Sequence, residues 1–94
     1  MIENKQLEYF IATAECGSFH EAAKVLYTTQ PNVSKTIANL ERQLGCALFL
    51  RDTRGITLTP KGRSFYERAR VVVADLKLLE DDFVRERVTG DANK

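Results

Sequence analysis

The chain has 94 residues, of which 44% are hydrophobic and 29% charged, and its formal net charge is +1. This length allows one small domain, and the composition is typical of a folded protein and excludes a disordered one. No apolar run approaches the roughly 18–20 residues that cross a bilayer, and the N-terminus lacks a signal-peptide pattern, so we expect a cytoplasmic protein.

The first half of the chain predicts three short helices. Apolar residues at helical spacing predict a helix over residues 5–16, which Gly17 ends. This apolar stripe consists of Leu7, Phe10, Ile11 and Ala14. Ser18 and Glu21 have the spacing of a capping box and predict a second helix that stops near Tyr27.

The third helix is expected over Gln30–Leu44, with Thr29 as its N-cap, Pro31 in its first turn and Gly45 as its stop. Its core stripe is Val33, Ile37, Leu40 and Leu44. Its exposed face is expected to carry Asn32, Ser34, Lys35, Asn39 and Arg42.

A short hairpin is expected next. Residues 47–50 and 56–58 are β-like runs, and the polar residues 51–55 between them include a glycine. Thr59 and Pro60 then begin a final helix that we expect to end near Arg87. The predicted fold class is therefore mainly α: a winged helix-turn-helix, with a three-helix core and a short hairpin wing, followed by a long helix.

The final helix carries a heptad seam of apolar residues at alternating spacings of four and three. These residues are Phe65, Ala69, Val72, Leu76, Leu79 and Phe83. Pairing with the same helix of a second chain would bury the seam, and packing on the chain's own core is the alternative. We favour a homodimer and expect a DNA-binding domain over 1–59, a linker or dimerisation helix over 60–88, and a frayed tail or linker over 89–94.

The charge distribution and the start of the third helix both favour DNA as the partner. Between residues 28 and 70, eight cations stand against three anions, although a solvated surface could show the same clustering. The major groove admits one helix, and Gln30, Asn32, Ser34 and Lys35 could read base edges there. Arg54, at the hairpin tip, suits a narrow minor groove. Arg51 is as consistent with a phosphate contact as with an ion pair to Asp52 or Glu41.

At these positions the chain resembles the LysR-type bacterial transcriptional regulators. The likeness covers about residues 5–66 and runs through Ser18-Phe19, Ala22-Ala23, Leu26, Thr29-Gln30-Pro31, Val33-Ser34-Lys35, Ile37, Leu40-Glu41, Leu44-Gly45, Leu48-Phe49, Arg51, Arg54, Leu58-Thr59 and Gly62. Lys35 stands where the family more often has arginine, and a lysine lacks the planar fork for bidentate guanine reading.

The resemblance implies sequence-specific binding of operator DNA by a dimer, or by a tetramer in the full-length protein. It implies that Gln30, Pro31, Ser34 and Lys35 approach bases in the major groove and that Arg54 approaches the minor groove. Thr29, Asn32, His20 and Arg51 complete the expected DNA-binding set. A small-molecule effector would bind only through a C-terminal domain that these residues cannot form. The alternative function is a protein-interaction and dimerisation module without base-specific reading.

Other functions find little support in the sequence. Cys16 and His20 have the spacing of two ligands on a helix, but Gly17-Ser18 interrupts it, so we expect no metal and two buried, inert thiols at Cys16 and Cys46. No catalytic constellation, phosphate-binding loop or cofactor motif is recognisable, so we do not expect an enzyme. Tyr9, Tyr27 and Tyr66 are expected to be half-buried core residues.

Overall fold

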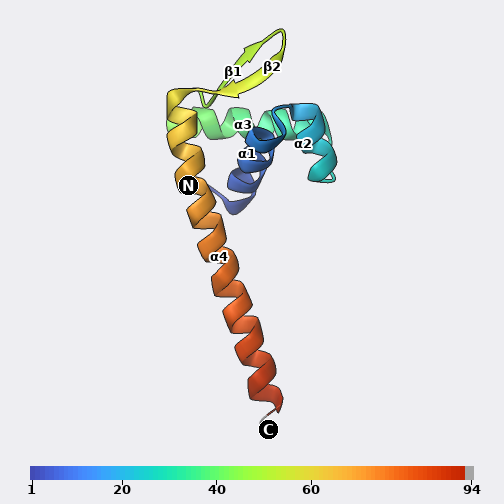
Figure 1. Ribbon diagram of the computed structural model, residues 1–94, viewed down its shortest axis with the longest axis vertical. Coiled ribbons are helices and arrows are strands. Elements are labelled where there is room, and N and C mark those ends of the chain that lie inside the picture. The colour runs from blue at the N-terminus through green and yellow to red at the C-terminus, as the bar shows by residue number, and fades with distance from the viewer. Residues whose placement is uncertain (93–94) are drawn as a thin grey trace.

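A computed structural model of the chain describes residues 1–92, with side chains described through residue 84. The element order is α1 (Asn4–Cys16), α2 (Phe19–Val25), α3 (Gln30–Leu44), β1 (Phe49–Asp52), β2 (Gly55–Leu58) and α4 (Pro60–Ala92). The first three helices form a compact head, the hairpin projects from it, and α4 runs away from it for most of its length (Figure 1). The predicted mainly α, winged helix-turn-helix class is confirmed. Within the described residues, no helix is long and apolar enough to cross a membrane.

The ends of the helices follow the local signals in the sequence. Gly17 (φ 69°) and Gly45 (φ 71°) adopt the left-handed conformation that ends α1 and α3. Ser18 Oγ accepts a hydrogen bond from the Glu21 N–H, as expected of an N-cap. The Glu21 carboxylate, expected to complete a capping box, instead lies 3.5 Å from Lys24 Nζ.

The core is built around Phe10, which is fully buried. Its ring centroid lies 5.3 Å from that of Phe49 and 5.1 Å from that of Phe65, so one side chain joins α1, the hairpin and α4. The predicted stripe of α3 is also confirmed, since Val33, Ile37 and Leu40 are buried and Leu44 is half-buried.

The buried face of α1 differs from the prediction. Gln6, Phe10 and Thr13 are buried, whereas Leu7, Ile11 and Ala14 are only half-buried. Both polar side chains enter the interior with partners: Gln6 Nε2 donates to Gln43 Oε1, and Thr13 Oγ1 donates to the Tyr9 carbonyl at 2.7 Å. Because these hydrogen bonds replace those to water, α1 can turn this mixed row inward.

The hairpin begins later and turns more tightly than expected. β1 pairs antiparallel with β2 in a register that places Phe49 opposite Leu58 and Asp52 opposite Gly55. The predicted start at residue 47 is wrong because the N–H groups of Leu48 and Phe49 donate to Glu41 Oε2, at 2.6 and 3.2 Å, instead of to a neighbouring strand.

The start of α4 is fixed against the end of the segment that leads into β1. Thr59 Oγ1 accepts from the Gly62 N–H at 2.9 Å and donates to the Ala47 carbonyl at 2.8 Å. Gly62 then passes so close to Leu48 that a Cβ at residue 62 would lie 2.0 Å from the Leu48 carbonyl oxygen. This junction sets the direction in which α4 leaves the head.

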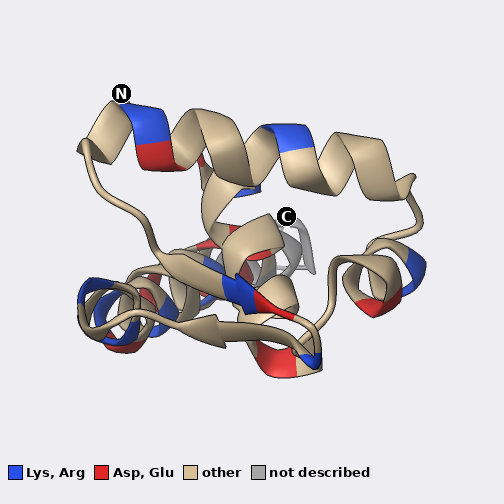
Figure 2. Cartoon of the chain, turned by 90° about the horizontal axis from the view of Figure 1, so that it is seen from above, with Lys and Arg blue, Asp and Glu red and all other residues tan. Residues whose placement is uncertain are grey.

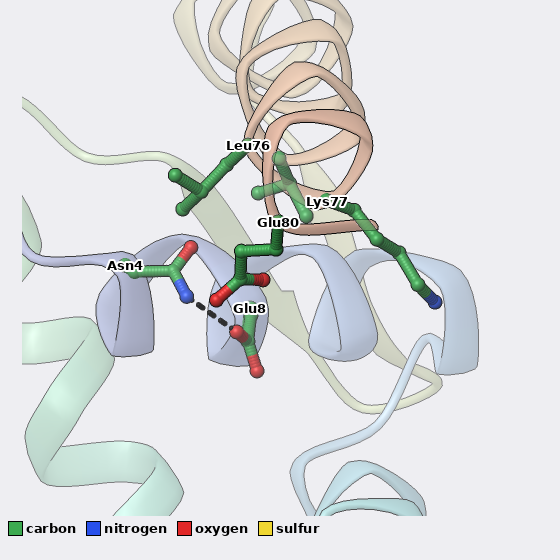
Figure 3. Close-up of a pocket in the computed structure, with 6 residues that line it drawn as sticks. Asn4, Glu8, Leu76, Lys77 and Glu80 are labelled. Atoms are coloured by element: carbon green, nitrogen blue, oxygen red, sulfur yellow. Dashed lines mark hydrogen bonds between the residues drawn. The ribbon is translucent and has the colours of Figure 1, made fainter. Parts of the chain in front are cut away.

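The seam of α4 divides into a covered and an uncovered part. Ala69 is buried and Phe65 and Leu76 are half-buried, whereas Val72, Leu79 and Phe83 are 53%, 54% and 64% exposed. Leu76 faces the start of α1, and the two together line a pocket to which Glu8 and Glu80 also contribute (Figure 3). The helix continues through Ala92, past the end expected near residue 87 or 88. Of the tail expected over 89–94, residues 93 and 94 lie outside the described residues.

Candidate nucleic-acid interface

The first turns of α3 present three of the predicted base-reading side chains. Gln30 and Lys35 are exposed and Ser34 is half-buried, so each has surface available to a ligand. Thr29 and Pro31 are also exposed, and Thr29 Oγ1 accepts from the Asn32 N–H at 3.2 Å. The capping bond and the proline ring hold the backbone of this turn before any ligand arrives.

Asn32 differs from the predicted placement on the exposed face of α3. It is half-buried, and its Nδ2 donates to Thr28 Oγ1 at 2.8 Å and to the Tyr9 hydroxyl at 3.3 Å. Both amide protons therefore serve contacts within the protein and are not free to pair with adenine. Asn32 ties the turn before α3 to α1, which a pattern of polar residues along the helix could not reveal.

Arg51 has a partner that the sequence did not suggest. Its guanidinium carbon lies 4.6 Å from the centroid of the Phe19 ring, in the geometry of a cation–π contact. The two carboxylates considered as ion-pair partners are used elsewhere: Asp52 accepts from the Arg54 N–H at 2.8 Å, and Glu41 accepts from two backbone N–H groups. Phe19 and Arg51 lie far apart in sequence, so no local signal could have predicted their contact.

The wing packs against the turn between α1 and α2. The rings of Phe19 and Phe49 have centroids 6.1 Å apart in an edge-on arrangement, and a Cβ at residue 55 would lie 3.4 Å from the Gly17 carbonyl oxygen. This packing places Arg54, beside Gly55 at the tip of the hairpin, near the start of α2. His20 is exposed at the start of α2.

The cations of this region are not neutralised by carboxylates. Among the described side chains, one ion pair forms, between Lys24 and Glu21. Lys35, Arg51 and Arg54 are all exposed, and Figure 2 shows lysine and arginine on α3 and along the hairpin. Unneutralised charges on a helix and on its neighbouring wing favour a polyanionic ligand.

The remaining titratable groups do not form a second site. Within the described residues, no cluster of three potential metal ligands exists, and Cys16 and Cys46, expected to be buried, are half-buried free thiols. Tyr66 donates to Glu15 Oε2 at 2.9 Å, and this hydrogen bond is the main cause that raises the pKa of the tyrosine above 10.0. Tyr66 joins α1 to α4 and does not lie on α3 or on the wing.

Three helices, a capped third helix with exposed polar first turns, and a hairpin directly after it define a winged helix-turn-helix domain. The chain belongs to the lysR family of bacterial regulatory helix-turn-helix proteins, since the model of that family matches residues 4–63. The family expected from the sequence is thereby confirmed.

Relatives in sequence are transcriptional regulators. The chain is 40% identical to the HTH-type transcriptional regulator TcbR of Pseudomonas sp. (strain P51), over 99% of this chain and 31% of that protein. It is 46% identical to ClcR of Pseudomonas putida, over 95% of this chain and 29% of that protein. It is also similar to TfdT of Cupriavidus pinatubonensis, with 42% identity over 78% of this chain and 32% of that regulator. The chain thus spans less than a third of the length of these regulators.

Two solved structures with the same fold were determined with DNA. The BenM_DBD/catB site 1 DNA complex has a TM-score of 0.89 and 35% identity, and the alignment covers 92% of this chain and 97% of that one. The CbnR_DBD-DNA complex has a TM-score of 0.79 and 40% identity, and the alignment covers 95% and 99% of the two chains.

Proposed function

We propose that this chain binds double-stranded DNA with sequence preference, as the DNA-binding part of a transcriptional regulator. The observation that carries the proposal is that Gln30 and Lys35, both exposed, and the half-buried Ser34 lie on the first turns of one capped helix. A glutamine amide can pair with adenine, a serine hydroxyl can serve several bases, and a lysine can reach the acceptors of guanine. The DNA complexes of the similar BenM and CbnR domains support this role.

The residues around this helix take supporting parts in the proposal. Lys35 is a point charge without the fork of an arginine, so it contributes to affinity and reads guanine less strictly. Arg54 enters the minor groove, where the negative potential of a narrow groove attracts it. The remaining members of the DNA-binding set contact the sugar–phosphate backbone of the DNA or hold the contacting residues in place. They are Thr29, Pro31, His20 and Arg51. Asn32 acts through its Oδ1 at most, because its amide protons are used within the protein.

Binding DNA is a non-catalytic role, and we propose no reaction for the chain. A duplex partner in a bacterium also implies that the protein acts in the cytoplasm. The operator and any effector are properties of a whole regulator. The similar regulators are about three times as long as the part of them that matches this chain.

Selection of bound sequences from random duplexes tests the proposal. The chain should enrich a defined sequence, and its affinity should fall steeply with salt as counterions are released. Gln30→Ala and Ser34→Ala should relax the preference at single base positions, whereas Lys35→Ala should also reduce the salt dependence by about one counterion. Lys77→Ala, on exposed α4, is the matched control and should leave both unchanged. Equal affinity for the selected and for random duplexes would refute base-specific reading.

We further propose that the chain dimerises through the uncovered part of the α4 seam, which contains Val72, Leu79 and Phe83. A groove of about 420 Å³ lined by Leu7, Phe65 and Val72, among others, continues this apolar surface toward the head. A second copy of α4 is the occupant that fits both the uncovered seam and this groove, since its own seam has the same heptad spacing. In the full-length regulator, two such dimers could form a tetramer.

The charges beside the seam favour an antiparallel pair of helices. Arg68, Asp75 and Asp82 recur every seven residues on one exposed flank. An antiparallel pair aligns this flank with itself, so Arg68 of each chain meets Asp82 of the other in two opposite-charge pairs, and the two Asp75 side chains meet in one like-charge pair. A parallel pair would place this flank along the opposite flank of the other helix, so Asp75 of each chain would face Glu80 of the other and give two like-charge pairs instead of one.

Charge exchange tests both the dimer and its direction. Arg68→Asp and Asp82→Arg should each lower the mass measured by sedimentation toward one chain. The double variant should restore the dimer if the helices are antiparallel. Failure of the double variant to restore it would refute the antiparallel pair, and a monomeric unsubstituted chain would refute dimerisation itself.

A further inference from the structure

Tyr27 is an unusual residue in the turn between α2 and α3. Its side chain is 96% exposed, which contradicts the expectation of a half-buried core tyrosine. It is also the one non-glycine residue with a positive φ, 55°, among the residues that the structure describes. A large aromatic side chain is thus held in a strained backbone conformation without contributing to the core.

The strain follows from the way α2 ends. The Thr28 N–H donates to the Ala23 carbonyl at 3.0 Å and the Tyr27 N–H donates to the Lys24 carbonyl at 3.2 Å. These two bonds form a Schellman motif, in which Tyr27 occupies the left-handed position that glycine favours. Leu26, immediately before it, is half-buried against the core, so the motif turns one apolar side chain inward and the next outward. Folding requires the motif and does not require the tyrosine ring.

The turn that carries Tyr27 leads directly into α3. Thr28 Oγ1 accepts from Asn32, Thr29 caps the helix, and Gln30 is its first residue. A helix whose first turn enters the major groove brings the segment immediately before it to the sugar–phosphate backbone at the edge of that groove. The Tyr27 hydroxyl, without a hydrogen-bond partner among the described residues, remains free to donate there.

We propose that Tyr27 is a DNA-backbone contact residue, whose hydroxyl donates a hydrogen bond to a phosphate oxygen at the edge of the groove that α3 enters. The proposal rests on the proposed DNA-binding function. A phosphate contact carries no sequence information, so Tyr27 contributes to affinity and orientation and not to base preference. A neutral donor releases no counterion, so its loss leaves the salt dependence unchanged, in contrast to the loss of Lys35.

Two variants separate the contribution of the hydroxyl from that of the ring. Tyr27→Phe removes the donor alone, and Tyr27→Gly removes the side chain and places glycine in a conformation that suits it. Each is titrated with the selected duplex and with a random duplex at several salt concentrations, and its thermal unfolding is followed by circular dichroism. Tyr66→Phe, which removes a tyrosine hydroxyl on α4, is the matched control and should bind like the unsubstituted chain.

Both Tyr27 variants should bind the two duplexes about tenfold more weakly, the change expected for one hydrogen bond to a charged oxygen, with unchanged preference and salt dependence. The Tm of Tyr27→Gly should be unchanged or raised by up to about 5 °C, so loss of binding cannot be ascribed to loss of folding. Unchanged affinity in both variants would overturn the proposal, and full affinity in Tyr27→Phe alone would overturn the phosphate hydrogen bond. If instead the unsubstituted chain prefers no sequence, the proposed function fails.

Discussion

Gly62→Ala tests how closely α4 is packed against the segment before the wing. An alanine Cβ would lie 2.0 Å from the Leu48 carbonyl oxygen and 2.9 Å from its carbonyl carbon. Both are backbone atoms, and Leu48 is 1% exposed, so neither can move aside as the end of a flexible side chain could. To reach ordinary contact, α4 must move by more than about 1 Å, which strains the two hydrogen bonds of Thr59 that anchor it.

The two contributions to the free energy of unfolding have opposite signs. Helix propensity favours alanine over glycine by up to about 1 kcal/mol. Overpacking of a rigid contact typically costs about 1–3 kcal/mol, and here the obstacle is backbone, so the cost lies at or above the upper end. We expect a net loss of about 2–3 kcal/mol, which for a domain of this size lowers Tm by roughly 10–20 °C.

Thermal and urea unfolding, followed by circular dichroism, measure this loss. Ser64→Ala is the matched control because Ser64 is exposed on the same turn of α4. That substitution should stabilise the protein slightly, by about 0.5 kcal/mol, through helix propensity alone. If Gly62→Ala behaves like Ser64→Ala, the close approach of α4 to Leu48 is wrong.

Three further substitutions probe the contacts that position the site. Asn32→Ala should cost about 1–2 kcal/mol of unfolding free energy, because two protein hydroxyls lose their donor; a change in base preference with unchanged stability would contradict this structural role. Phe19→Leu should weaken binding to all duplexes, because the wing and Arg51 lose the ring on which they pack; unchanged affinity by titration would contradict it. The hydrogen bond to Glu15 raises the pKa of Tyr66 in the folded protein. Its contribution to the free energy of unfolding is therefore complete below pH 10.0 and disappears as the pH rises through the folded-state pKa. Tyr66→Phe should abolish this alkaline loss of stability, which is measured by comparing the unfolding of the two proteins over a range of pH.

Local sequence signals located the helices and the start of the candidate site. A capping serine or threonine and a glycine that ends a helix act through backbone groups within about four residues. Gly17 and Gly45 were therefore sufficient to place the ends of α1 and α3, and Ser18 and Thr29 to place the starts of α2 and α3. The same signals placed Gln30 and Lys35, which are exposed, in the first turns of α3. The heptad spacing likewise identified α4 as a long helix with an apolar seam, but it left open whether the seam was internal.

Contacts between residues that are distant in sequence could not be predicted from the sequence pattern and were shown only by the tertiary structure. Periodicity could not show that Gln6 and Thr13, rather than Leu7, enter the core, because their burial depends on partners that include Gln43. The inward turn of Asn32, the Arg51–Phe19 contact and the need for glycine at residue 62 likewise depend on segments brought together only by packing. A helical period reports which residues share a face, whereas the identity of the neighbouring element determines whether that face is buried, bonded or left for a ligand.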